Sequence, residues 1–299
     1  MATNRKSYPC TLLVDNGSLR AQATLNLRRL ASALSERVES TVHPVSLLHS
    51  SKVDEDELQG VPADIFESFI QKRRAEGTHS FLIVPLFFGH SAAIYEYLPQ
   101  RVMALRDEGW PELEVRIAPC LVDVGNRADT GVAEILASLV RKTMRLEKLR
   151  LPAVTLVDHG TPRVAVNRVR NFLAEQLAGI MEGEVSMVRP SSMERREGIQ
   201  YDFNEPLLEN LLGSEEFEQD VILSMLFLSP GRHAGPGGDI AQICADAEER
   251  NPRLKTHMSD LFTTSPKVID LLLTRMDQGA ENKPVEGEIA FPGSIRGTD

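Results

Sequence analysis

Two histidines stand in segments whose composition suits metal chemistry. His159 lies in VDHGT at 157–161, and His233 lies in the glycine-rich segment SPGRHAGPGGD at 229–239. Neutral imidazole is a common ligand of Co²⁺, Fe²⁺, Ni²⁺ and Zn²⁺, and its free nitrogen can also accept a proton. A lone histidine is more often a structural residue, so the hypothesis of a metal site depends on whether the two segments meet.

Strand-like apolar runs alternate with helical patterns along the chain, and each run ends at turn residues. We expect strands at 10–14, 42–48, 81–87, 113–118, 153–157, 185–188, 220–228 and 254–258. We expect helices at 21–38, 63–75, 92–106, 128–146, 164–181, 206–212, 238–250 and 266–276. This order predicts an α/β protein with parallel sheets flanked by helices.

Both histidines follow predicted strands, where ligands bind in parallel α/β sheets. In a flavodoxin-like order the first and third strands of a sheet are neighbours, which would bring the two imidazoles across one crevice. The glycines beyond His233 would let the backbone turn closely around a large ligand, with a helix N-terminus facing anionic groups. The alternative is that these glycines only form the entry to a helix.

A constant offset of 143 residues relates the two halves of the sequence. It pairs Asp15 with Asp158, Gly17 with Gly160, Arg20 with Arg163, His90 with His233, and Glu96 with Asp239. Agreement in two separate segments indicates an internal duplication rather than a shared apolar periodicity. We therefore expect two similar lobes at 1–149 and 150–278, followed by a mobile tail at 279–299 that has Gly, Pro and charge without periodicity.

The DHG segment after one predicted strand and the run LFLSPGRHAGPGGDI at 226–240 resemble the class II tetrapyrrole chelatases. These are the cobaltochelatases and ferrochelatases that act on sirohydrochlorin in cobalamin and sirohaem synthesis. The likeness covers most of both halves and is to the long, duplicated form of the family. It implies that each lobe is a four-stranded parallel sheet flanked by helices, and that the tetrapyrrole lies in the cleft between two lobes.

The resemblance also implies the site. In the family the metal is held by the histidine after the first strand and by the histidine in the loop after the third, often with a glutamate from the second-strand region. Carried over to this chain, these positions are His159, His233 and Glu194. His159 and His233 are the metal ligands, and one histidine or Glu194 accepts the protons. The alternative for Glu194 is a solvated carboxylate in the charged run at 194–197.

The first lobe departs from the family pattern, because Asn16 stands where the repeat has His159. A carboxamide is a poor ligand for these metals, although His90 is retained. We therefore expect a single metal site in the second lobe. The first lobe is expected to bind tetrapyrrole edges through Asn16 and His90, with His90 as a candidate second proton acceptor.

Three arginines flank the predicted loops and are candidates for binding the substrate. Sirohydrochlorin carries several carboxylates, and guanidinium groups bind carboxylates in bidentate fashion. Arg20, Arg163 and Arg232 would supply these contacts, since the chain as a whole has a formal net charge of −10. The alternative is that they only solvate loop ends.

The composition excludes several function classes. The acidic net charge argues against a nucleic-acid binder, and the longest apolar runs are strand-sized, far too short to span a membrane. The segment MATNRKSYPC lacks the apolar core of a signal peptide, which predicts a cytoplasmic protein. Three widely spaced cysteines, Cys10, Cys120 and Cys244, are expected to be free thiols.

Together these observations predict a lyase-type sirohydrochlorin metal chelatase that is a monomer or homodimer. It would need no cofactor beyond the substrate metal, which would be Co²⁺ or Fe²⁺, with Ni²⁺ as a further candidate. A rival interpretation is a non-catalytic tetrapyrrole or metal carrier on the same fold. A weaker rival is a periplasmic-type binding protein with two α/β lobes, which the duplicated loop motifs and the lack of a signal segment disfavour.

Overall fold

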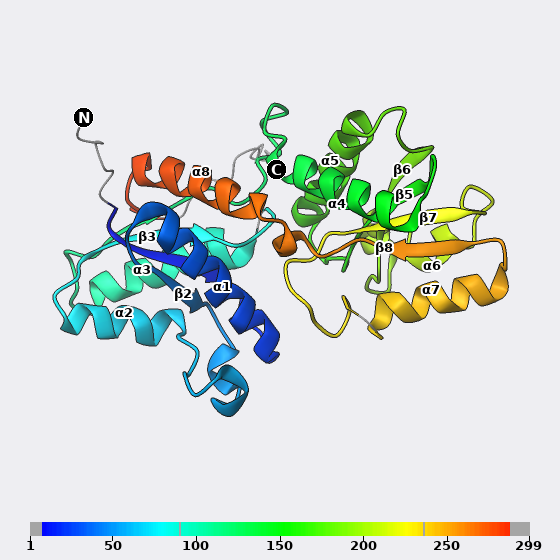
Figure 1. Ribbon diagram of the computed structural model, residues 1–299. Helices are drawn as coiled ribbons and strands as arrows, with labels where there is room; N and C mark the ends of the chain where they lie inside the picture. The colour runs from blue at the N-terminus through cyan, green and yellow to red at the C-terminus, as the bar shows by residue number, and fades with distance from the viewer. Residues whose placement is uncertain (1–7, 90, 236, 288–299) are drawn as a thin grey trace. The chain divides into compact units, whose positions relative to one another are not determined.

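The protein contains two compact units, each built on one four-stranded parallel sheet (Figure 1). The computed structural model describes residues 8–89, 91–235 and 237–287. The first unit comprises the residues up to Gly125 together with those from Ile269 onward, and the second unit runs from Asn126 to Val268. The predicted α/β class with two similar lobes is confirmed.

The first unit has the strand order β2-β1-β3-β4. Its strands are β1 (Cys10–Asp15), β2 (Val42–Ser46), β3 (Ser80–Pro85) and β4 (Glu114–Ile117). Its helices are α1 (Ala21–Val38), α2 (Phe66–Ala75), the π-helical turn η3 (Ala93–Tyr97), α3 (Leu98–Asp107) and α8 (Lys267–Glu281), with short 3₁₀ turns η1 (Ser50–Lys52) and η2 (Asp56–Leu58).

The second unit repeats this arrangement with the order β6-β5-β7-β8. Its strands are β5 (Ala153–Asp158), β6 (Met187–Ser192), β7 (Asp220–Met225) and β8 (Lys255–Met258). Its helices are α4 (Gly131–Glu147), α5 (Val164–Ile180), α6 (Leu208–Leu212) and α7 (Asp239–Arg250), with 3₁₀ turns η4 (Ile199–Asn204) and η5 (Phe262–Thr264).

Apolar runs without alternation explain why these sheets are covered on both faces. The successive residues Leu12, Leu13 and Val14 of β1 are all buried, as are the residues of β5 from Ala153 to Val157. Successive side chains of a strand point to opposite faces, so such strands need a helical layer on each side. The amphipathic helices provide these layers.

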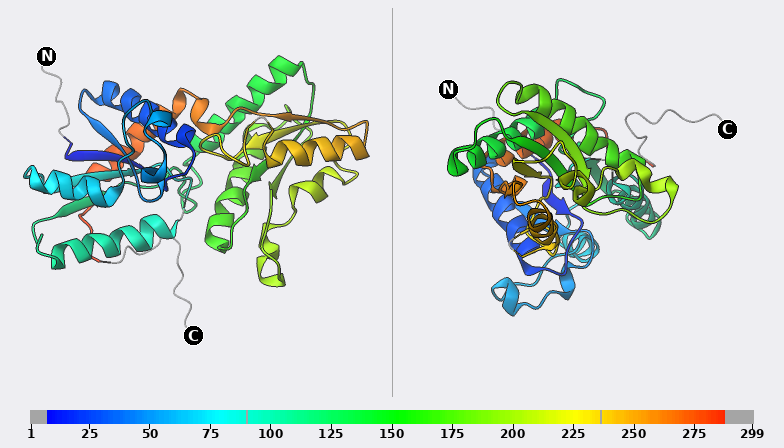
Figure 2. Two further views of the ribbon diagram at one scale, coloured as in Figure 1. Left: turned by 90° about the horizontal axis from the view of Figure 1, so that it is seen from below. Right: turned by 90° about the vertical axis from the view of Figure 1, so that its right-hand side faces the viewer.

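Two long helices pack against sheets other than those the predicted lobes assign to them. Helix α4 precedes the predicted boundary at 149/150, but it packs on α5 and β7 of the second unit. Helix α8 belongs to the first unit (Figures 1 and 2). Its Gly279 lies directly against Ala118 and Leu82. The division of the chain by packing therefore differs from the predicted one at both boundaries, because an amphipathic pattern shows that a helix packs on a sheet without showing which sheet.

The expected mobile tail at 279–299 is wrong for its first part. Helix α8 continues to Glu281, and Val285 is a buried member of the core of the first unit. The Val285 amide donates a hydrogen bond to the Val115 carbonyl of β4. The Arg106 guanidinium donates to the Val285 carbonyl and the Asn282 carboxamide donates to the Ile117 carbonyl, so these bonds and the buried Val285 hold the segment on the first unit. Residues 288–299 lie outside the described residues.

Two further expectations concern helices and cysteines. No helix among the described residues has the length and apolar character needed to cross a membrane. Cys10, Cys120 and Cys244 are free thiols, as predicted, and the latter two are buried.

Candidate metal centre

The two histidines meet at the carboxyl edge of the second sheet. His159 directly follows β5, and His233 lies in the loop after β7, which is the neighbour of β5 in the sheet. Their ring centroids are 4.5 Å apart and the ring planes cross at 71°. We call these residues the histidine pair. One ion bound by both would lie about 2.0–2.1 Å from a nitrogen of each ring, and adjacent crossed rings can present one nitrogen each to the same point.

A carboxylate orients His233. Its Nδ1 lies 2.6 Å from Oδ2 of Asp239, the first residue of α7. Because a carboxylate only accepts, Nδ1 is the donor of this bond, which leaves Nε2 as the ring nitrogen that can face a ligand. Asp239 was predicted only as a repeat partner of Glu96, not as a site residue. An acidic residue six positions after a candidate histidine ligand was the signal that could have revealed it.

His159 is oriented in the same sense by its own turn. Its Nδ1 lies 3.2 Å from the carbonyl oxygen of Gly160, which can accept a proton from that nitrogen. Nε2 of His159 then faces Glu194, with 3.5 Å between Nε2 and Oε1. Both side chains are about half-exposed, which leaves the group open to a ligand.

A close backbone approach places Glu194 beside His159. Gly160 has φ +94°, and a Cβ there would lie 1.9 Å from the Glu194 carbonyl oxygen. The Glu194 amide donates to the His159 carbonyl at 3.1 Å, so the two loops are tied directly together. Only glycine fits this contact and this backbone conformation.

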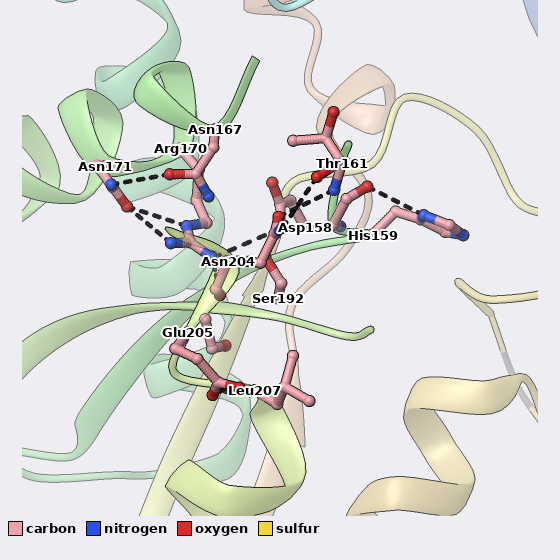
Figure 3. A network of polar contacts seen from close by, with 12 residues as sticks. Asp158, His159, Thr161, Asn167, Arg170, Asn171, Ser192, Asn204, Glu205 and Leu207 are labelled. Atoms are coloured by element: carbon pink, nitrogen blue, oxygen red, sulfur yellow. Dashed lines mark hydrogen bonds and ion pairs between the residues drawn. The ribbon is translucent and has the colours of Figure 1, made fainter. Parts of the chain in front are cut away.

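Asp158 closes the turn from inside the protein. Its Oδ1 accepts hydrogen bonds from the Gly160 amide and the Ser192 hydroxyl, at 3.1 and 2.6 Å. Burial raises the pKa of Asp158, while the Ser192 hydroxyl and the Arg170 guanidinium lower it. Figure 3 shows these groups gathered behind the turn, with the His159 ring pointing away from them. The aspartate thus supports the turn rather than facing a ligand.

The first unit has the same turn without the same donors. Gly17 has φ +86°, and a Cβ there would lie 1.6 Å from the Leu48 carbonyl oxygen. Asn16 is exposed at the position of His159, and the Leu48 amide bonds to the Asn16 carbonyl just as the Glu194 amide bonds to that of His159. Leu48 is therefore the structural counterpart of Glu194. His90, the predicted partner of Asn16, lies outside the described residues.

The three predicted substrate arginines are placed at loop and helix ends. Arg20 and Arg163 occupy equivalent N-cap positions of α1 and α5, and both are exposed. Arg232 is 74% exposed at its side chain, with Nε 3.5 Å from Asp239. Arg163 and Arg232 thus belong to the loops that carry the histidine pair, where they can reach a bound anion.

The second unit therefore presents two imidazole nitrogens and one nearby carboxylate on a single edge. This set can bind a divalent ion through nitrogen and accept protons through nitrogen or oxygen. Across the residues that the structure describes, no group of three or more His, Cys, Asp or Glu side chains is arranged to hold a metal ion. The structure thus brings His159 and His233 together and places Glu194 beside His159.

Comparison with known proteins identifies the fold. No family model matches the sequence, and no curated protein matches it. Among solved structures, SirB from Bacillus subtilis with Fe³⁺ has a TM-score of 0.66 at 16% identity, covering 91% of this chain and 95% of that one. The sirohydrochlorin chelatase SirB from Bacillus subtilis subspecies spizizenii in complex with cobalt has a TM-score of 0.64 at 17% identity, with the same coverages.

A third similar structure is CbiX, described as the terminal enzyme of sirohaem biosynthesis in denitrifying bacteria. Its TM-score is 0.57 at 15% identity, covering 89% of this chain and 98% of that one. The likeness extends over nearly the full length of each of these proteins. The chain therefore has the two-lobed fold of the class II chelatases, as the sequence motifs predicted.

Proposed function

We propose that this protein is a sirohydrochlorin chelatase that inserts Co²⁺ or Fe²⁺ into the tetrapyrrole. The observation that carries the proposal is the histidine pair, whose ring centroids lie 4.5 Å apart at the carboxyl edge of adjacent strands. The shared fold supports it, since proteins with that fold are named as sirohydrochlorin chelatases and one of them binds cobalt.

In the proposed reaction the metal is a substrate, held first by Nε2 of His159 and of His233. Bonds from the ion pass from the imidazoles to the pyrrole nitrogens of the macrocycle, and two pyrrole N–H protons leave as one M²⁺ enters. Glu194 lies beside His159 and accepts one proton, and an imidazole released by the metal accepts the other. The charge balances, so neither ATP nor a redox partner is required.

Arg163 and Arg232 are the proposed contacts for substrate carboxylates in the second unit. Their positions in the loops of the histidine pair support this role, because a guanidinium can bind a carboxylate with two parallel hydrogen bonds. In the first unit, Asn16, Arg20 and His90 remain predicted substrate contacts without a role as metal ligands.

The decisive experiment is a multiple-turnover assay. Free sirohydrochlorin is followed by its absorbance, in excess over the protein, with Co²⁺ or Fe²⁺ added. An enzyme consumes many equivalents, whereas a non-catalytic carrier stops after one equivalent has bound. Stoichiometric binding without turnover would overturn the proposal in favour of the carrier.

The same assay separates the candidate metals. Imidazole pairs select weakly among divalent first-row ions, so supply of the ion contributes to the choice. Insertion rates with Co²⁺, Fe²⁺ and Ni²⁺, measured singly and in competition, would assign the protein to cobalamin or to sirohaem synthesis. A rate with Ni²⁺ far above the other two would contradict both assignments.

A further inference from the structure

A buried arginine lies behind the turn that carries His159. Arg170 is 1% exposed, on the face of α5 that also buries Leu173 and Leu177. Removing a guanidinium from water is unfavourable unless it is paired, and an apolar residue of similar size is often as good for stability. A charge retained at this position therefore calls for a role other than filling the core.

The guanidinium has four hydrogen bonds to oxygens. Nη1 donates to the Ser192 hydroxyl and, at 2.8 Å, to the Asn204 carbonyl. Nε and Nη2 both donate to Oδ1 of Asn171, at 3.1 and 2.9 Å. The nearest carboxylate oxygen, Oδ1 of Asp158, is 3.9 Å from Nη1. Arg170 thus links helix α5 to the end of β6 and to the loop after it.

Its partners hold the residues on both sides of His159. The Ser192 hydroxyl donates to Asp158 at 2.6 Å. Asn204 is fully buried, and its carboxamide accepts from the Thr161 amide at 3.0 Å and donates to the Thr161 carbonyl at 2.9 Å. Figure 3 shows this chain of contacts running from Arg170 to the turn. We call Arg170, Ser192, Asn204 and Asp158 the support network.

The first unit provides an internal control for this network. The 143-residue offset places Leu27 at the position of Arg170, and Leu27 is 2% exposed. Ser50, not an asparagine, accepts the bond from the amide of Ser18, the counterpart of Thr161. The same α/β unit therefore folds with leucine at this position, and the unit with leucine is the one whose turn carries Asn16 instead of histidine.

The first unit also has an arginine that ties its α1 helix to the loop after β2, but from the outside. Arg28 is only half-buried and donates to the carbonyls of Leu58, Val61 and Pro62, all beyond η1. It contacts neither Asn16 nor its turn in the described hydrogen bonds. The loop after β2 is thus anchored to α1 although Leu27 stands at the position of Arg170. Holding this loop in place therefore does not require an arginine behind the turn.

We infer that Arg170 is a positioning residue, which fixes the imidazole of His159 toward the metal by holding Asp158 and Thr161 through Ser192 and Asn204. This inference deepens the proposed function and rests on it, since it assigns the network to the metal-binding step. Partners that orient metal ligands in this way typically change metal affinity by about 10–100-fold when removed.

The test measures binding of Co²⁺ alone, by titration and by the visible spectrum of the bound ion, in the full-length protein. Arg170→Leu introduces the residue of the first unit, Arg170→Lys retains a cation that can donate to the same oxygens, and Arg28→Leu is the matched control. We expect Arg170→Leu to weaken Co²⁺ binding by about 10–100-fold and to change its spectrum. Arg170→Lys should recover part of the loss, and Arg28→Leu should match the wild type.

A folded Arg170→Leu protein with wild-type affinity and spectrum would overturn the inference. Circular dichroism and thermal melting check folding; if Arg170→Leu does not fold, Ser192→Ala carries the test, with several-fold weaker Co²⁺ binding expected and unchanged binding contradicting the role. If the wild type inserts metal but Arg170→Leu binds Co²⁺ as the wild type does, this inference is refuted and the proposed function stands. If the wild type never inserts metal but Arg170→Leu binds Co²⁺ more weakly than the wild type, the proposed function is refuted and this inference stands.

Discussion

The two units share a turn but differ in the chemistry placed on it. In both, an aspartate accepts a hydrogen bond from the amide of a glycine two residues later, at 3.0 Å for Asp15 and Gly17 and 3.1 Å for Asp158 and Gly160. In both, that glycine has a positive φ and touches the loop after the second strand. The backbone of the turn is thus independent of the side chain between its aspartate and glycine.

The units differ in the residues at the turn and in some of those behind it. Asn16 and Leu48 in the first unit correspond to His159 and Glu194 in the second. Behind the turn, the first unit has an apolar residue where the second has Arg170. Asp158 and Ser192 of the support network have counterparts in Asp15 and Ser46, which also share a side-chain hydrogen bond, so Arg170 and Asn204 are the members that differ along with the donors.

The largest effect is expected from His159→Ala compared with Asn16→Ala. Removing His159 takes away one of the two imidazoles and a proton acceptor, so we expect kcat for metal insertion to fall by about 10²–10⁴-fold. Asn16→Ala removes an exposed carboxamide from an equivalent turn and should change kcat little. Initial rates of loss of free sirohydrochlorin absorbance measure both.

His90→Ala completes this comparison. A loss with His90→Ala as large as the one expected for His159→Ala, together with an unaffected His159→Ala, would move the metal site to the first unit. The single-site assignment would then be wrong.

The two turn glycines give the next largest effect. A Cβ at Gly17 or Gly160 would overlap a carbonyl oxygen, and the positive φ alone should lower the free energy of unfolding by about 1–3 kcal/mol in either alanine variant. Only Gly160→Ala should also weaken Co²⁺ binding, toward the upper end of the about 10–100-fold range, because it displaces Glu194 from His159. Denaturant unfolding and Co²⁺ titration measure the two quantities.

Gly17→Ala is the matched control for this pair. Equal losses of Co²⁺ affinity in both variants would show that overall destabilisation, and not local displacement, governs binding.

Much of this arrangement could be predicted from the sequence. Apolar runs located every strand, although β6 (Met187–Ser192) continues four residues beyond the predicted 185–188 through Arg, Pro and two Ser residues. The order of strands and helices predicted that the segments before His159 and His233 would be neighbours. The positions of His159 and His233 could be predicted because apolar periodicity and turn residues depend only on nearby residues in the sequence.

Contacts between segments that are far apart in the sequence could not be predicted in this way. The constant offset pairs Glu194 with Ser51, yet the backbone approach pairs it with Leu48, because the loops after β2 and β6 differ in path. Arg170 was visible as a charge within an apolar helical face, but its bonds to Ser192 and Asn204 depend on how two loops pack. Sequence periodicity identifies a buried position without identifying its partners.

A smaller effect is expected at the carboxylate of His233. Asp239→Asn replaces the acceptor of the Nδ1 proton with a carboxamide, so the ring loses a charged partner that fixes its tautomer. We expect Co²⁺ affinity to fall by about 10-fold or more, within the range for residues that orient metal ligands. Titration with Co²⁺ measures the change.

Glu96→Gln is the control, since the offset places Glu96 at the corresponding position of the first unit. It should leave Co²⁺ affinity unchanged. Equal effects of the two substitutions would mean that general surface charge, rather than the bond to His233, determines the affinity.

The smallest effect is expected at Glu194, and it distinguishes a proton acceptor from a solvated loop carboxylate. The side chain is 59% exposed and its Oε1 is 3.5 Å from Nε2 of His159, a separation at which it can receive a proton without fixing the ring. Glu194→Gln should therefore lower kcat for insertion by about 10-fold, below the usual range for a fully engaged acid–base group, and change Co²⁺ affinity less. Glu197→Gln, in the same charged run, should change neither quantity. Because the first unit has Leu48 at this position, Glu194→Leu should match Glu194→Gln if proton transfer is the lost function, whereas wild-type kcat in both variants would assign the carboxylate to solvation alone.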